Sequence, residues 1–226
     1  MTTIADNLQA VRARIDRAAR AARRAGDAVT LLAVSKTHAA TRIDEARAAG
    51  QIAFGENYVQ EALDKMAQLP RLEWHLIGPL QSNKTRLAAE RFDWVQTVAS
   101  EKIAKRLSEQ RPAHLAPLNV LVQVNVSGEA SKSGAAPGEV RDLAAKIKAL
   151  PRLRLRGLMA IPEAGAARER YAAVREIFDS LKADFGFDTL SLGMSDDLEM
   201  AIAEGATMVR IGTAIFGARR KEKSAA

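Results

Sequence analysis

The sequence predicts a single (β/α)8 barrel of the TIM type, an α/β fold, preceded by an N-terminal amphipathic helix. Eight short apolar runs recur along the 226 residues, and segments with helical periodicity or composition separate them. Alternating strands and helices are typical of a parallel sheet, and eight such units without any linker favour one closed barrel over two domains. A doubly wound open sheet is the alternative. We therefore expect one domain over residues 1–226.

The N-terminal helix is predicted over residues of about 3–25. Apolar side chains recur there at alternating spacings of four and three, and they are Ile4, Leu8, Val11, Ile15, Ala18 and Ala22. This spacing puts them on one face of a helix. Gly26 suits the C-terminal stop of that helix.

The strands and helices of the barrel follow in alternation. The strand-like runs are 30–35, 51–55, 74–78, 93–98, 119–126, 155–161, 189–193 and 207–212. The helical segments are 41–50, 56–69, 86–91, 101–110, 137–150, 168–181 and 196–206. The third unit is the weakest, because its helical segment 86–91 is short. The segment 127–138 after the fifth strand has the length of an active-site loop.

The composition excludes several classes of function. The chain has no cysteine, which excludes disulfides and thiolate metal sites, and its three histidines are scattered. No apolar run approaches the roughly 18 residues of a spanning helix, and the first residues lack a signal-peptide core, so we expect a cytoplasmic protein. The net charge of +7 suits an anionic ligand or nucleic acid. Arginines on a solvated helix face would also explain much of this charge.

A lysine ends the first predicted strand. In the run LLAVSK, Lys36 follows four apolar residues and a serine. Active sites of such barrels lie at the carboxyl ends of the strands. Side chains alternate along a strand, so Leu32, Val34 and Lys36 share one face. If Leu32 and Val34 point into the barrel, Lys36 points into its mouth; a solvated loop is the alternative.

Two segments at the same end of the barrel are candidates for a phosphate site. Such barrels often bind phosphate with the loops after strands seven and eight. Ser195 follows the seventh strand, and Gly212 and Thr213 follow the eighth, where they offer backbone N–H groups and a hydroxyl. A helix cap is the alternative for the first segment, with Asp196 and Glu199 in a capping box.

Arg210 is the one charged residue within the eighth predicted strand. Its permanent charge is suited to a ligand in the barrel mouth, or to an ion pair with a carboxylate at the strand end. A phosphate site on one side of the mouth and a lysine on the other fit a phosphorylated carbonyl compound held as a Schiff base. Pyridoxal 5'-phosphate (PLP) satisfies both ends.

Seven longer motifs occur in a fixed order over most of the chain, namely LLAVSKTH, FGENYVQE, WHLIGPLQSNK, VQVNVSGEASKSG, GLMAIP, LGMSDDLEMAI and VRIGTAIFG. Together they closely resemble the pyridoxal phosphate homeostasis protein family, which has the barrel fold of the alanine racemase N-terminal domain. The resemblance implies that Lys36 carries PLP as a Schiff base and that Arg210 faces the pyridine nitrogen. It also implies that the phosphate lies among Ser195, Gly212 and Thr213. An arginine does not readily give the pyridine nitrogen a proton, so carbanion chemistry should be weak.

Four further residues near the mouth have open roles. Asn57 follows the second strand and His75 lies within the third, so both approach the cofactor ring if their side chains point inward. The alternatives are a turn or helix cap for Asn57 and a hydrogen-bonded core histidine for His75. Lys84 and Lys132 lie in loops at the same end, where exposed lysines are the default and an anionic partner is the alternative.

Three functions are compatible with these residues. A racemase needs an acid or base on each face of the substrate, and Lys36 supplies only one. Tyr58 is the sole candidate for the second, because Tyr171 lies in a predicted outer helix. We therefore expect a monomeric protein of vitamin B6 homeostasis that stores, buffers or carries PLP, with PLP-dependent apo-enzymes as recipients. A weak amino-acid racemase is the first alternative, and a basic nucleic-acid-binding protein is the second.

Overall fold

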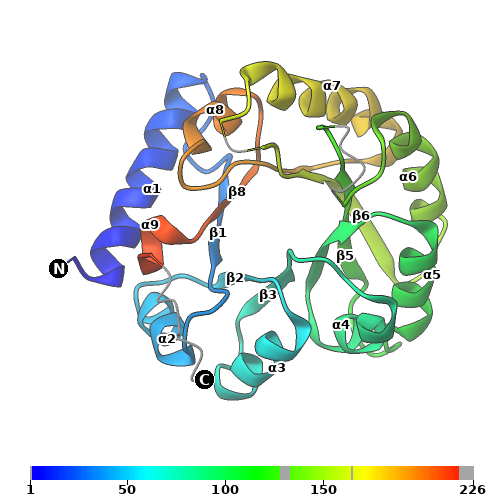
Figure 1. The fold of residues 1–226 in the computed structure, drawn as a ribbon, viewed down its shortest axis with the longest axis horizontal. Helices are drawn as coiled ribbons and strands as arrows, with labels where there is room; N and C mark the ends of the chain where they lie inside the picture. The colour runs from blue at the N-terminus through cyan, green and yellow to red at the C-terminus, as the bar shows by residue number, and fades with distance from the viewer. Residues whose placement is uncertain (1, 128–132, 164, 219–226) are drawn as a thin grey trace, which may run out of the picture.

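Eight parallel strands close into a barrel in their sequence order in the computed structural model, which describes residues 2–127, 133–163 and 165–218. Closure is made by the first and last strands, where Thr30 pairs with Met208 and Ala33 with Ile211. The helices surround the strands as an outer ring (Figure 1). The predicted barrel is confirmed, and the open sheet is excluded.

The strands are β1 (Thr30–Val34), β2 (Ala53–Glu56), β3 (Glu73–Leu76), β4 (Trp94–Val98), β5 (Leu118–Val124), β6 (Leu153–Ala160), β7 (Thr189–Ser191) and β8 (Met208–Ile211). The α-helices are α1 (Ile4–Ala21), α2 (Ala40–Ala48), α3 (Val59–Gln68), α4 (Thr85–Arg91), α5 (Glu101–Gln110), α6 (Val140–Lys148), α7 (Arg168–Phe185), α8 (Leu198–Ala203) and α9 (Thr213–Phe216). Two 3-10 turns, η1 (Ser82–Lys84) and η2 (Pro137–Glu139), precede α4 and α6.

The strand side chains divide between two layers of core. The larger layer lies between the strands and the helices and includes Leu31, Ala33 and Phe54. The barrel interior holds two small clusters, which are Leu32, Val34, Ala53, Ile77 and Met208, and Trp94, Leu121 and Met159. Leu32 and Val34 therefore point into the barrel, as the expectation for Lys36 requires.

Helix α1 packs along the outside of the barrel beside α8 and α9 (Figure 1). It begins with a capping box, in which Thr3 N–H donates to Asp6 at 2.9 Å and Asp6 N–H donates to the Thr3 hydroxyl at 3.1 Å. It ends at Ala21, earlier than the predicted position of about 25, because Arg23 adopts the left-handed region with φ of 57°. Periodic apolar residues thus predict the helix well but not its last turn.

None of the helices in the described part of the chain has both the length and the apolar character needed to span a bilayer.

Candidate functional site

Lys36 lies in a turn two residues beyond the end of β1 and is partly exposed. Val34, two residues earlier, points into the barrel. Strand alternation, if it continued past the end of β1, would put Lys36 on the same side. Ser35 takes the opposite direction and is fully buried between β2 and α3. The turn that carries Lys36 is thus anchored on its outer side by Ser35.

A buried ionic cluster anchors this turn from outside. Lys65 of α3 donates from Nζ to the Ser35 carbonyl at 2.8 Å, to Glu56 Oε1 at 2.7 Å and to Glu61 Oε1 at 2.6 Å. Ser35 Oγ donates to the same Glu56 oxygen at 2.6 Å. Burial raises the pKa of Glu56, an effect that Lys65 opposes. Thr37 N–H donates to Glu61 at 2.5 Å, so Lys36 lies between two residues held by one cluster.

The sequence analysis did not predict this cluster, although one residue of α3 indicates it. Lys65 falls at the spacing of the buried face of α3, three residues after Ala62 and six after Val59. A lysine on an apolar helix face is unusual unless it has a buried partner. Glu56, at the end of an apolar strand, is that partner.

The segments after β7 and β8 lie together beside the end of β1. Ala214 N–H points to Ser195 Oγ at 3.4 Å, which joins the two loops. Gly212 packs against β1 so closely that a Cβ there would lie 3.2 Å from the Val34 carbonyl oxygen. Ser195, Gly212 and Thr213 thus lie together beside Val34, which precedes Lys36 by two residues in the sequence.

The capping box considered for Asp196 and Glu199 is not formed. Helix α8 begins at Leu198, after Asp197 in the N-cap position. Glu199 instead forms an ion pair with Arg14 of α1 at 2.9 Å. Ser195 is therefore not the N-cap of α8.

Two outer helices hold the β7–α8 loop in place. Arg14 of α1 donates to the Ser195 carbonyl at 3.1 Å, in addition to its pair with Glu199. Tyr171 of α7 donates its hydroxyl to Asp197 at 2.5 Å, and Asp197 also accepts the Met194 N–H. Burial raises the pKa of Tyr171, so this hydroxyl stays protonated. At least one arginine of α1 thus has a structural partner and is not simply solvated.

Arg210 is buried in β8 with 4% of its surface exposed. Its guanidinium donates from Nη1 to Ser191 Oγ at 2.8 Å and from Nη2 to the Ala160 carbonyl at 2.9 Å. Among the residues that the structure describes, it forms no ion pair, so the strand-end pair considered above is absent there. Burial lowers the pKa of Arg210 to about 10, which leaves it charged at neutral pH.

His75 lies inside the barrel and is fully buried. Its Nε2 is 2.7 Å from Glu73 Oε1, and its Nδ1 is 2.9 Å from Gln96 Nε2. The ring stacks on Trp94 with centroids 5.0 Å apart. Burial lowers the pKa of His75. Both ring nitrogens have protein partners, which favours the core-histidine interpretation over direct contact with a cofactor.

Asn57 lines a cavity of about 310 Å³ at the carboxyl ends of β2 to β6. Helix α3 starts at Val59 with Tyr58 in the N-cap position, so Asn57 is not the cap. Its backbone presses against Gly78, where a Cβ would lie only 2.2 Å from the Asn57 carbonyl oxygen. A glycine at 78 is therefore required for Asn57 to lie at the mouth.

The remaining residues of the predicted mouth are less constrained. Tyr58 is 61% exposed. Lys84 ends η1 and is partly exposed. Lys132 lies outside the described residues. Within the described ranges, no group of three or more histidine, aspartate and glutamate side chains could hold a metal ion.

Comparison with known proteins identifies the class of this barrel. The family model of the alanine racemase N-terminal domain matches residues 7–220. The solved structure of alanine racemase from Corynebacterium glutamicum has the same fold, with a TM-score of 0.71 at 18% identity over 97% of this chain and 63% of that one. The chain is thus an alanine racemase N-terminal-domain barrel.

Full-length relatives define the family more closely. A pyridoxal phosphate homeostasis protein of Pseudomonas aeruginosa is 61% identical over 225 residues, with 97% of each chain covered. The structure of PipY from Synechococcus elongatus with PLP bound superposes with a TM-score of 0.83 at 37% identity, covering 95% of this chain and 100% of that one. The chain belongs to the pyridoxal phosphate homeostasis protein family, and the predicted resemblance is confirmed.

Proposed function

We propose that this protein binds PLP in the barrel mouth through a Schiff base to Lys36 and acts as a store, buffer or carrier in vitamin B6 homeostasis. The observation that carries the proposal is the convergence of three kinds of group on adjacent strands. These are the lysine after β1, the hydroxyl and glycine loops after β7 and β8, and the buried arginine of β8. The PLP-bound PipY structure and the homeostasis relatives support the same ligand.

The residues fit the two ends of PLP. Ser195, Gly212 and Thr213 offer hydroxyl and backbone donors for the phosphate, and the lack of a Cβ at Gly212 lets its backbone lie directly against Val34. Arg210 uses two of the five N–H groups of its guanidinium on Ser191 and Ala160, which leaves donors for the pyridine nitrogen. When bound, PLP supplies an aldehyde for the lysine amine and an electron-withdrawing ring.

Storage or transfer fits these residues better than racemisation. A racemase would need a second acid or base opposite Lys36. Tyr58 is largely exposed, and the Tyr171 hydroxyl is committed to Asp197. Arg210 is a second argument against racemisation, because a guanidinium keeps its proton and leaves the pyridine ring of PLP a poor electron sink. We propose cytoplasmic PLP-dependent apo-enzymes as recipients and a monomer as the working form.

An absorption titration tests the proposal. Purified protein mixed with PLP should gain the Schiff-base band at roughly 410–430 nm, a range characteristic of PLP bound to lysine. Lys36→Ala should lose this band and keep the circular dichroism spectrum of the wild type, whereas the control Lys84→Ala should keep both. A wild-type protein that gains no band would overturn the proposal. Sustained turnover of an added amino acid would instead favour the racemase.

A further inference from the structure

A continuous chain of side chains crosses the barrel interior from the buried Arg210 to Glu73, a partly exposed residue of the opposite wall. Arg210 Nη1 lies 2.8 Å from Ser191 Oγ, and Ser191 Oγ lies 2.7 Å from Gln96 Oε1. Gln96 Nε2 then lies 2.9 Å from His75 Nδ1, and His75 Nε2 lies 2.7 Å from Glu73 Oε1. Ser191, Gln96 and His75 are each 0% exposed. We name these five residues the interior chain.

The two ends of the interior chain fix the direction of every hydrogen bond between them. A guanidinium can only donate, and a carboxylate can only accept. The Ser191 oxygen accepts from Arg210, so its O–H donates onward to Gln96 Oε1. The Gln96 amide then donates from Nε2 to His75 Nδ1, which leaves the ring proton on Nε2 to donate to Glu73.

The opposite assignment is unfavourable at more than one bond. It would set an unprotonated Nε2 against the Glu73 carboxylate, with two lone pairs 2.7 Å apart. It would also turn the Gln96 oxygen toward Met208 Sδ, which now accepts from Gln96 Nε2 at 3.1 Å. A buried acceptor facing another acceptor loses a hydrogen bond without solvent to replace it. The hydrogen on His75 is therefore held on Nε2.

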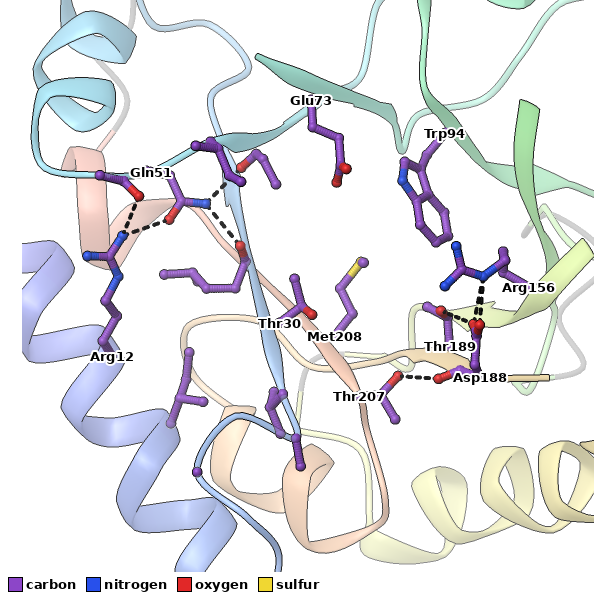
Figure 2. A pocket seen from close by; sticks show the side chains of 18 residues that line it. Arg12, Thr30, Gln51, Glu73, Trp94, Arg156, Asp188, Thr189, Thr207 and Met208 are labelled. Carbon is purple, nitrogen blue, oxygen red and sulfur yellow. Dashed lines mark hydrogen bonds and ion pairs between the residues drawn. The ribbon is translucent and has the colours of Figure 1, made fainter. Parts of the chain in front are cut away.

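The far end of the interior chain opens into a cavity at the amino ends of the strands. This cavity has a volume of about 780 Å³ and is lined by Glu73, Trp94, Arg156, Asp188 and Met208, among others. Figure 2 shows the Glu73 carboxylate facing this cavity, across from Asp188. Asp188 accepts from Arg156 at 2.8 Å, and in the part of the chain that the structure describes it forms no hydrogen bond with the interior chain. It is therefore a matched control for Glu73 at the same end.

We propose that Ser191, Gln96 and His75 are positioning residues that aim the Arg210 guanidinium at the ring of bound PLP. The proposal rests on the proposed function, which puts the ring beside Arg210. A serine hydroxyl normally rotates and presents either its hydrogen or its lone pairs. Here the commitment of that hydrogen to Gln96 keeps a lone pair directed at Arg210, so the guanidinium has one preferred orientation.

The first test needs no PLP. Nitrogen-15 NMR of the His75 ring in the full chain should show an unprotonated Nδ1 and a protonated Nε2 at neutral pH. Gln96→Glu places an acceptor on Nδ1, so both ring nitrogens of that variant should carry protons. Asp188→Asn should leave the His75 signals unchanged. A wild-type ring protonated on Nδ1, or a Gln96→Glu ring with the wild-type pattern, would contradict the interior chain.

The second test links the interior chain to PLP. Ser191→Ala should weaken PLP binding about tenfold, the effect of one lost hydrogen bond on the ligand's partner, and should shift the absorption maximum. Ser191→Thr keeps the hydroxyl and should restore both, and Asp188→Asn should change neither. If Ser191→Ala fails to fold, Gln96→Leu interrupts the interior chain at the next hydrogen bond, the one from Ser191 to Gln96.

The outcomes separate the two proposals. A wild-type protein without a PLP band would overturn the proposed function and the positioning role with it, while the His75 signals would still report whether the interior chain exists. A normal wild-type band with an unshifted spectrum and unchanged affinity in a folded Ser191→Ala protein would overturn the positioning role alone.

Discussion

The two ends of this barrel use charged residues in opposite ways. At the amino end, charged side chains are paired with one another or with backbone groups, as Arg156 is with Asp188 at 2.8 Å and Arg12 with the carbonyls of Ala49 and Gly50. At the carboxyl end, the Arg210 guanidinium donates to a hydroxyl and a carbonyl, and within the described residues these use two of its five N–H groups. Paired charges stabilise a fold, whereas a buried charge with donors to spare is available to a ligand.

The carboxyl end also depends on support from outside the strands. The Lys65 cluster holds the residues on both sides of Lys36, and Arg14 and Tyr171 hold the loop of Ser195. We therefore expect changes at the carboxyl end to alter PLP binding, and changes at the amino end outside the interior chain to alter only stability.

The largest effect is expected from Lys65→Met. The substitution leaves the Glu56 carboxylate buried without its cation, which should lower the free energy of unfolding by about 3–5 kcal/mol. Urea unfolding followed by circular dichroism measures this loss. Lys105→Met is the control, because Lys105 forms a half-exposed pair with Glu101 and should cost at most about 1 kcal/mol. Equal losses of unfolding free energy in the two variants would show that the buried Lys65 cluster stabilises the fold no more than an exposed ion pair does.

The next effect concerns the phosphate end of PLP. Charge-assisted hydrogen bonds contribute about 1.5–3 kcal/mol each, so pyridoxal should bind far more weakly than PLP despite its identical aldehyde. Thr213→Val should weaken PLP binding and leave pyridoxal binding unchanged. Fluorescence titration with both aldehydes measures the difference. Equal affinity of the wild type for the two compounds would exclude a phosphate site after β7 and β8.

A smaller effect is expected at the amino end. Arg156→Gln breaks the pair with Asp188 and the contact of the guanidinium with Trp94, 4.8 Å from the ring centroid. The loss of stability should be about 0.5–1 kcal/mol, since both partners are partly exposed. PLP affinity should stay at the wild-type value. A tenfold loss of PLP affinity in Arg156→Gln would contradict the claim that this amino-end pair contributes to stability alone.

The smallest effect should appear only as a dependence on pH. The hydrogen bond from Arg14 lowers the pKa of Glu199, so this pair stabilises the fold above the unfolded-state pKa of about 4.3. The stability is lost as the pH falls through the lower folded-state value. The melting temperatures of the wild type and Arg14→Gln should therefore differ at pH 6 and converge near pH 3. A constant difference over this range would assign the effect of Arg14 to its bond with the Ser195 carbonyl.

The sequence predicted the positions of two candidate site residues, because each is a lone charged residue beside or within an apolar run. Lys36 and Arg210 are single charges in strand-like segments, and their placement follows from strand alternation and from the active-site end of the barrel. The barrel itself was predictable because eight units repeat without interruption. The placement of the two residues and the repeat of the barrel units both follow from local sequence patterns, which can be recognised without the structure.

The supporting contacts were not predictable in the same way, because their partners are distant in sequence. Gln96 meets Ser191 across 95 positions, and Arg14 meets Glu199 across 185. Neither periodicity nor composition reports such pairs. His75 illustrates the consequence: its strand was predicted correctly, but only the three-dimensional arrangement shows Gln96, 21 residues away, at its Nδ1.

Chemical trapping of the Schiff base identifies the lysine that holds PLP. Borohydride reduction of the protein loaded with PLP converts the Schiff base into a stable amine, and peptide mapping by mass spectrometry then locates the modified lysine. We expect the pyridoxyl group on Lys36. A group on Lys84 or Lys132 with Lys36 unmodified would contradict it.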